Sequence, residues 1–157
     1  MRGFEKISFN QFCKDICTNK KMYEEYNLPI RSTKNSAGYD FFALQDYVIK
    51  PNDIIKIPLG VKVYMQDDEV LFLVVRSSMG FKYNVRLTNQ VGVIDSDYYN
   101  NPDNEGHMWL CLQNEGTTDF IIKKGDKILQ GIFVKYLTVN NEKNIENVRT
   151  SGIGSTN

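Results

Sequence analysis

Histidine and cysteine are scarce in this 157-residue sequence, and their scarcity argues against a zinc site. His107 is the only histidine, and Cys13 and Cys17 have a spacing that could suit a metal but no second cysteine pair to complete the ligand set. The third cysteine makes the count odd, and the N-terminus shows no secretory signal pattern. We therefore expect reduced thiols and a cytoplasmic protein.

Net charge and long apolar runs are also lacking. Nineteen Lys and Arg residues balance nineteen Asp and Glu residues, so global charge gives no reason to expect a nucleic-acid partner or an anionic membrane. No apolar run approaches the roughly 18 residues of a membrane span. We expect neither nucleic acid nor membrane as a partner, and any anion site must be built locally.

The composition that remains, 41% hydrophobic and 24% charged, is typical of a globular protein, and the length predicts a single domain over residues 1–157. Near the N-terminus, Ser8 and Gln11 have the spacing of a helix-capping box. An apolar stripe at helical spacing follows: Phe9, Phe12, Cys13, Ile16 and Cys17. The pattern predicts a short helix, packed on the outside of the domain, within an N-terminal extension of residues 1–27.

From about Ser36 onward, short apolar or alternating runs separated by turn residues predict an all-β fold. The expected strands cover residues 48–49, 54–57, 61–65, 70–75, 108–112, 120–122 and 132–139. The last residues, from Thr150 onward, are almost exclusively Ser, Thr and Gly. We expect residues 148–157 to form a mobile C-terminal arm.

The most informative segment runs from Leu87 to Tyr98. Its apolar residues flank Gly92 and then give way to Asp95 and Asp97, which indicates a strand that delivers an acid to a surface cleft. Considered alone, this acidic turn is more simply a solvated loop. The segment resembles the third motif of the trimeric dUTPases, however, and four more segments resemble the other motifs of that family in the family's order.

The resemblance implies a role for each residue of this third motif. Asn89 would contact uracil in a narrow hairpin whose backbone reads the base, and Gly92 would keep the floor of that hairpin clear. Tyr98 would pack beneath the deoxyribose, and Asp95 would be the catalytic base that activates water for attack on the α-phosphorus. The residues implied to bind base and sugar are Asn89, Gly92, Val93, Tyr98 and Ile153.

The other four motifs are implied to hold the phosphates. They are the segments 37–43, 76–80, 124–131 and 149–156, each of which would pass for an ordinary loop or strand by itself. The residues implied to bind phosphate are Arg76, Ser77, Ser78, Gln130, Arg149, Gly154, Ser155 and Thr156. Asp40 would support the phosphate and metal region. In the family, the arm that carries Arg149 closes over the site of another subunit.

The clearest departure from the family pattern lies in the C-terminal arm. The family usually has an aromatic residue that stacks on uracil where this sequence has Ile153. An isoleucine covers the base without a flat π-face, so we expect a weaker lid and a higher KM with activity retained. The spacing of residues 78–89 and 99–108 is closer to the versions from Gram-positive bacteria and their phages.

The resemblance, which covers about residues 28–156, implies a jelly-roll subunit in a homotrimer with shared active sites. The implied reaction is Mg²⁺-dependent hydrolysis of dUTP to dUMP and pyrophosphate, which limits uracil in DNA and supplies dUMP for dTTP synthesis. The metal would be held by the triphosphate and waters, with no direct protein ligand. Two alternatives stay open: a dCTP deaminase of the same fold, and a non-catalytic nucleotide-binding regulator that acts through a protein partner.

Overall fold

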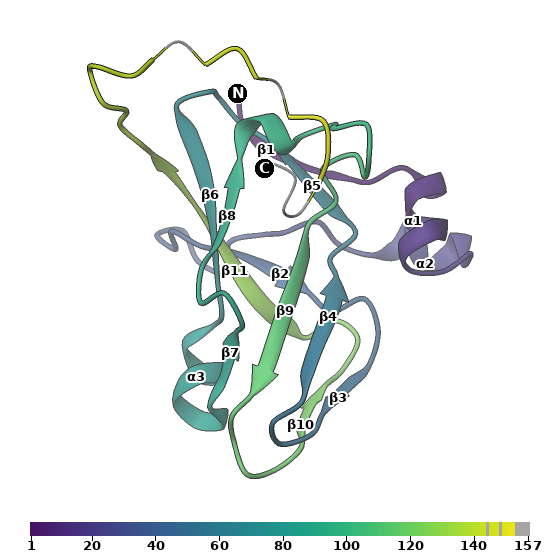
Figure 1. The fold of residues 1–157 in the computed structure, drawn as a ribbon. Coiled ribbons are helices and arrows are strands. Elements are labelled where there is room, and N and C mark those ends of the chain that lie inside the picture. The colour runs from purple at the N-terminus through teal and green to yellow at the C-terminus, as the bar shows by residue number, and fades with distance from the viewer. Residues whose placement is uncertain (144, 148, 153–157) are drawn as a thin grey trace.

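The computed structural model describes residues 1–143, 145–147 and 149–152 (Figure 1). In chain order its elements are β1 (Gly3–Lys6), α1 (Phe9–Asp15), α2 (Lys20–Glu25), β2 (Tyr39–Phe42), β3 (Tyr47–Ile49), β4 (Ile54–Pro58), β5 (Val61–Tyr64), β6 (Glu69–Val74), α3 (Ser77–Tyr83), β7 (Val85–Leu87), β8 (Gly92–Asp95), a 3₁₀ turn (Ser96–Tyr98), β9 (Trp109–Asn114), β10 (Phe120–Ile122) and β11 (Lys127–Lys135). The predicted all-β class is confirmed.

Two antiparallel sheets form most of the fold. One has the strand order β2-β11-β6-β8 and the other β4-β9-β7, while β1 pairs with β5 and β3 with β10. The buried core joins side chains from both larger sheets, such as Leu71 and Leu129 from the first and Ile57 and Leu112 from the second. Among the described residues, no helix has the length and apolar character needed to cross a membrane.

The N-terminal segment is more than the single helix that the sequence predicts. Ser8 caps α1 as expected, because its hydroxyl accepts a hydrogen bond from the backbone N–H of Gln11. However, β1 precedes this helix and α2 follows it, and neither was predicted. Ile7 and Phe12 are fully buried, so the segment contributes to the core as well as covering it.

Two other sequence predictions are wrong in detail. The last strand runs over Lys127–Lys135 and not over 132–139, because it starts after the Gly125 turn and its pairing with β6 ends at the Lys135–Glu69 pair. The expected hairpin after Asn89 is also absent, since β7 pairs with β9 and β8 pairs with β6. The turn between them therefore carries the chain from one sheet to the other.

The first residues are clamped to the start of β6 by a buried carboxylate. Glu69 is 2% exposed and accepts hydrogen bonds from the Arg2 guanidinium, with Nε at 2.9 and 3.0 Å, and from the backbone N–H of Gln66 at 3.1 Å. The hydrogen bonds from Arg2 are the main cause that lowers the pKa of Glu69 to about 2, although burial acts in the opposite direction.

This clamp predicts an acid-dependent loss of stability. The pKa of Glu69 is lower in the folded chain than the value of about 4.3 expected when unfolded, so its ionised form stabilises the fold above that pH. This contribution is lost as the pH falls toward 2. We expect Glu69→Gln to have a lower Tm than the wild type at pH 7, with the gap narrowing below about pH 4.3. A gap in Tm that is constant from pH 7 to pH 2 would contradict this.

Candidate functional site

A cavity of about 240 Å³ lies along β8 and the turn that follows it. Four residues that the sequence predicts to bind base and sugar line it, together with the predicted catalytic acid: Asn89, Gly92, Val93, Tyr98 and Asp95. Trp109 of β9 and Leu73 of β6 complete much of the wall. The structure thus brings these predicted residues together at one hollow between the two larger sheets.

Asp95 ends β8 and is open to solvent. Its side chain is 52% exposed, and its Oδ2 accepts a hydrogen bond from Nη2 of Arg149 at 2.7 Å. Nε of the same arginine lies 2.9 Å from Oδ1 of Asp97. Arg149 therefore contacts two carboxylates of its own chain, whereas the family resemblance implies a role at the site of another subunit.

Tyr98 is almost completely buried, and the guanidinium of Arg149 lies over its ring, 5.8 Å from the ring centre. Its hydroxyl donates to the backbone carbonyl of His107 at 2.9 Å and accepts a hydrogen bond from Nδ2 of Asn104, also at 2.9 Å. Burial is the main cause that raises the pKa of the Tyr98 phenol, so the group is neutral at physiological pH. Two hydrogen bonds and close packing thus fix the ring at the floor of the cavity.

A second group of predicted residues gathers where β6 ends. Arg76 precedes α3, and its Nε lies 3.3 Å from Oδ1 of Asp40 on β2. Nζ of Lys127 lies 3.0 Å from the other oxygen of Asp40, which also accepts a hydrogen bond from the hydroxyl of Ser32. Burial opposes ionisation of Asp40, but these hydrogen bonds and positive charges outweigh it and lower the pKa. The result is a basic group with one carboxylate.

Gln130 joins this second group from β11. It lies opposite Val74 of β6 on one side and Asp40 of β2 on the other, and its Nε2 donates to the carbonyl of Val75 at 3.5 Å. A Cβ atom at Gly38 would lie 2.5 Å from Oε1 of Gln130, so a larger residue there would displace the amide of Gln130 from this position. The predicted phosphate-binding residues Ser77 and Ser78 form the first turn of α3, directly after Arg76.

Strand register separates the two groups. Asp95 lies opposite Val70 near the start of β6, whereas Arg76 follows Val70 by six residues and lies beyond the other end of that strand. At about 3.3 Å per residue this is a separation of about 20 Å. Figure 1 shows α3 and the 3₁₀ turn after β8 at opposite ends of the sheet. The predicted residues Ile153, Gly154, Ser155 and Thr156 lie outside the described part of the chain.

Lys127, Trp109 and Asn104 are among the residues at these groups that were not predicted. Lys127 falls within the motif of residues 124–131, and its position after a Gly-Asp turn was the available signal. Trp109 is the only tryptophan in the sequence and could have been singled out on that ground. Asn104 lies in a polar turn without any local pattern that points to Tyr98. Its role became visible only with the folded chain.

The family model for dUTPase matches residues 24–157. The chain belongs to the dUTPase family. A deoxyuridine 5'-triphosphate nucleotidohydrolase from Lactococcus lactis is 47% identical over 157 residues, which cover 99% of this chain and 97% of that protein. The corresponding protein of Pseudomonas fluorescens is 36% identical, with coverage of 80% and 82%.

Solved structures agree with this assignment. The crystal structure of the dUTPase from Streptococcus mutans matches with a TM-score of 0.72 and 37% identity, over 88% of this chain and 99% of that one. A dUTPase from phage phi11 of S. aureus, described with a structural Mg(II) ion, matches with a TM-score of 0.69 over 94% and 97% of the two chains. Its 20% identity supports the fold alone. The predicted dUTPase-like jelly-roll is thus confirmed.

Proposed function

We propose that this protein hydrolyses dUTP to dUMP and pyrophosphate, and so removes dUTP and supplies dUMP. Family membership supports the substrate and reaction class. The observation that carries the mechanism is the position of Asp95, which ends β8 at the rim of the cavity lined by Asn89 and Tyr98. A base bound toward Asn89 would leave the α-phosphorus near the carboxylate.

In the proposed mechanism, Asp95 orients a water molecule and accepts its proton as the water oxygen attacks the α-phosphorus. The bond between the α-phosphorus and the oxygen that bridges it to the β-phosphate breaks, and pyrophosphate leaves with the electron pair. The proton then passes from Asp95 to solvent. Because Arg149 pairs with Asp95 in the free chain, the substrate phosphates would compete for this guanidinium and free the carboxylate.

We propose further that the active site is shared between copies in a homotrimer. A nucleotide that runs from Asn89 toward Asp95 extends away from Arg76 of the same chain, which lies at the other end of β6. Its β- and γ-phosphates would therefore be bound by Arg76, Ser77 and Gln130 of another copy. The exposed Val93 and Phe81 leave apolar surface available for such contacts.

Mg²⁺ would enter with the triphosphate and keep several waters. Among the described residues, no group of three His, Cys, Asp or Glu side chains is arranged to hold a metal. Asp40 could contact the hydrated ion through water. When bound, the ion would neutralise charge on the transferred and leaving phosphates.

Pyrophosphate release from dUTP, dCTP, dTTP and UTP in the presence of Mg²⁺ tests the proposal. We expect dUTP to be preferred to dCTP by about 10⁴-fold in kcat/KM, since cytosine leaves buried hydrogen-bonding groups of a uracil site unpaired. Ammonia release from dCTP would instead favour the deaminase. Nucleotide binding without release of pyrophosphate or ammonia would favour the regulator that acts through a protein partner.

A further inference from the structure

The loop of residues 99–107 lies between the N-terminal segment and the floor of the cavity. It follows Tyr98 directly and returns the chain to β9. Its inner side holds the tyrosine, since Nδ2 of Asn104 donates to the Tyr98 hydroxyl at 2.9 Å. Nδ2 of Asn101, which is 4% exposed, in turn donates to Oδ1 of Asn104 at 2.9 Å. The amide that holds Tyr98 is thus itself fixed within the loop.

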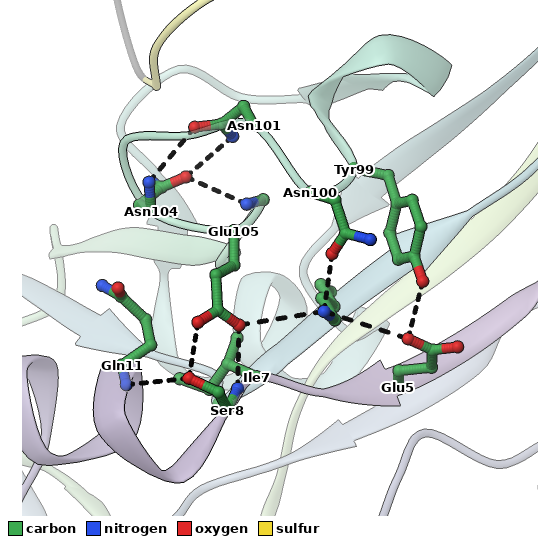
Figure 2. Close-up of polar contacts among 12 residues, drawn as sticks. Glu5, Ile7, Ser8, Gln11, Tyr99, Asn100, Asn101, Asn104 and Glu105 are labelled. Atoms are coloured by element: carbon green, nitrogen blue, oxygen red, sulfur yellow. Dashed lines mark hydrogen bonds and ion pairs between the residues drawn. The ribbon is translucent and has the colours of Figure 1, made fainter.

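The outer side of the loop is held by the N-terminal segment through Glu105 (Figure 2). One carboxylate oxygen of Glu105 accepts a hydrogen bond from the backbone N–H of Ser8 at 2.8 Å, and the other accepts one from the Ser8 hydroxyl. Nζ of Lys62 lies 3.7 Å from the same carboxylate. Burial opposes ionisation, but these hydrogen bonds and the lysine charge outweigh it and lower the pKa of Glu105. The carboxylate therefore stays charged at neutral pH.

The backbone at Glu105 is in an unfavourable conformation for its residue type. Its φ of 60° lies in the left-handed region, which disfavours a glutamate more than a glycine or an asparagine. Gly106 follows with φ of 79°, and a Cβ there would lie 2.5 Å from the carbonyl oxygen of Tyr98. Such conformations persist only where surrounding contacts enforce them. Asparagine or glycine would fit this backbone better but could not reach Ser8.

We propose that Glu105 is a positioning residue for the part of the cavity that would bind deoxyribose. By tying the loop of residues 99–107 to Ser8, it holds Tyr98 in place. The proposal rests on the function proposed above. Ser8 lies outside the stretch that the family model matches, so the anchor comes from the N-terminal segment. Loss of the anchor would let Tyr98 shift, which would weaken deoxyribose binding and the exclusion of a 2′-hydroxyl.

The test is the substitution Glu105→Asn. Asparagine suits the left-handed backbone, but its side chain is too short to contact Ser8. We expect KM for dUTP to rise about tenfold, and the preference for dUTP over UTP to fall by a similar factor, while Tm changes little. Binding of a non-hydrolysable α,β-imido dUTP is measured separately from the change in fluorescence of Trp109. This is the only tryptophan in the sequence, and it lines the cavity. We expect its Kd to rise by the same factor.

A second variant, Ser8→Asp, keeps the helix cap of α1, because a carboxylate accepts the Gln11 N–H, but it repels Glu105. We expect it to reproduce the effect of Glu105→Asn, and the double variant to add little, since both break one contact. Glu24→Gln is the matched control, as it removes one charge from an exposed position of α2 and is expected to change neither KM nor selectivity.

The outcomes separate the two proposals. If the wild-type protein neither binds the dUTP analogue nor releases pyrophosphate, the proposed function fails. If the wild type is active and both Glu105→Asn and Ser8→Asp keep its KM, its Kd and its preference for dUTP over UTP, the positioning role is overturned. A fall in Tm without any change in KM or selectivity would assign Glu105 to folding alone, and would overturn it equally.

Discussion

Replacing Asp95 with asparagine is expected to lower kcat for dUTP by about 10²–10⁴-fold, the contribution of a positioned general base. The amide has the size of the carboxylate and can still orient a water, but it cannot accept the proton. KM is expected to change little, because Asn89, Gly92 and Tyr98, which line the cavity, are intact. Pyrophosphate release gives kcat, and Trp109 fluorescence with the non-hydrolysable analogue gives Kd.

Asp97→Asn is the matched control for this substitution. Asp97 is two residues away, is as exposed as Asp95, and also pairs with Arg149. The control therefore removes one charge and one contact to the arm but leaves the proposed base in place. We expect it to lower kcat less than tenfold. Equal losses for the two variants would show that the pairing with Arg149, and not proton transfer, explains the effect.

The sequence predicted the local features of the fold better than its pairings. Alternating runs such as residues 61–65 and 108–112 indicate strands because side chains on one face are buried, and strands lie at both places. By contrast, β1 contains a single large apolar residue, Phe4, and α3 has only seven residues with Gly80 in its interior, so neither carries a strong periodic signal. These elements form because tertiary contacts support them.

The candidate site shows the same division. The motifs identified most of the residues around the cavity. They did not predict which of the site residues lie at the same end of a sheet. The antiparallel register of β6 and β8 decides this, and it depends on which strands pair across the whole fold. The contact between Glu105 and Ser8 spans 97 positions, and no local pattern could have predicted it.

The strongest test of a shared site is to mix two inactive variants. Arg76→Ala removes a proposed phosphate-binding group, and Asp95→Asn removes the proposed base, so each homotrimer should have little activity. In a cyclic trimer whose sites combine Asp95 of one copy with Arg76 of the next, every mixed trimer contains one site with both residues intact. About three quarters of randomly assembled trimers are mixed, so an equimolar mixture should recover about a quarter of wild-type activity.

This recovery requires exchange of subunits, which co-expression or joint refolding provides. The size of the mixed assembly is measured by light scattering beside the activity. A site built within one chain would give no recovery, because each chain would lack one of its two groups. Recovery in a trimeric sample would instead mean that the two ends of β6, about 20 Å apart in one chain, belong to different active sites. The separation of Arg76 from Asp95 would then be the reason that a single chain cannot catalyse the reaction.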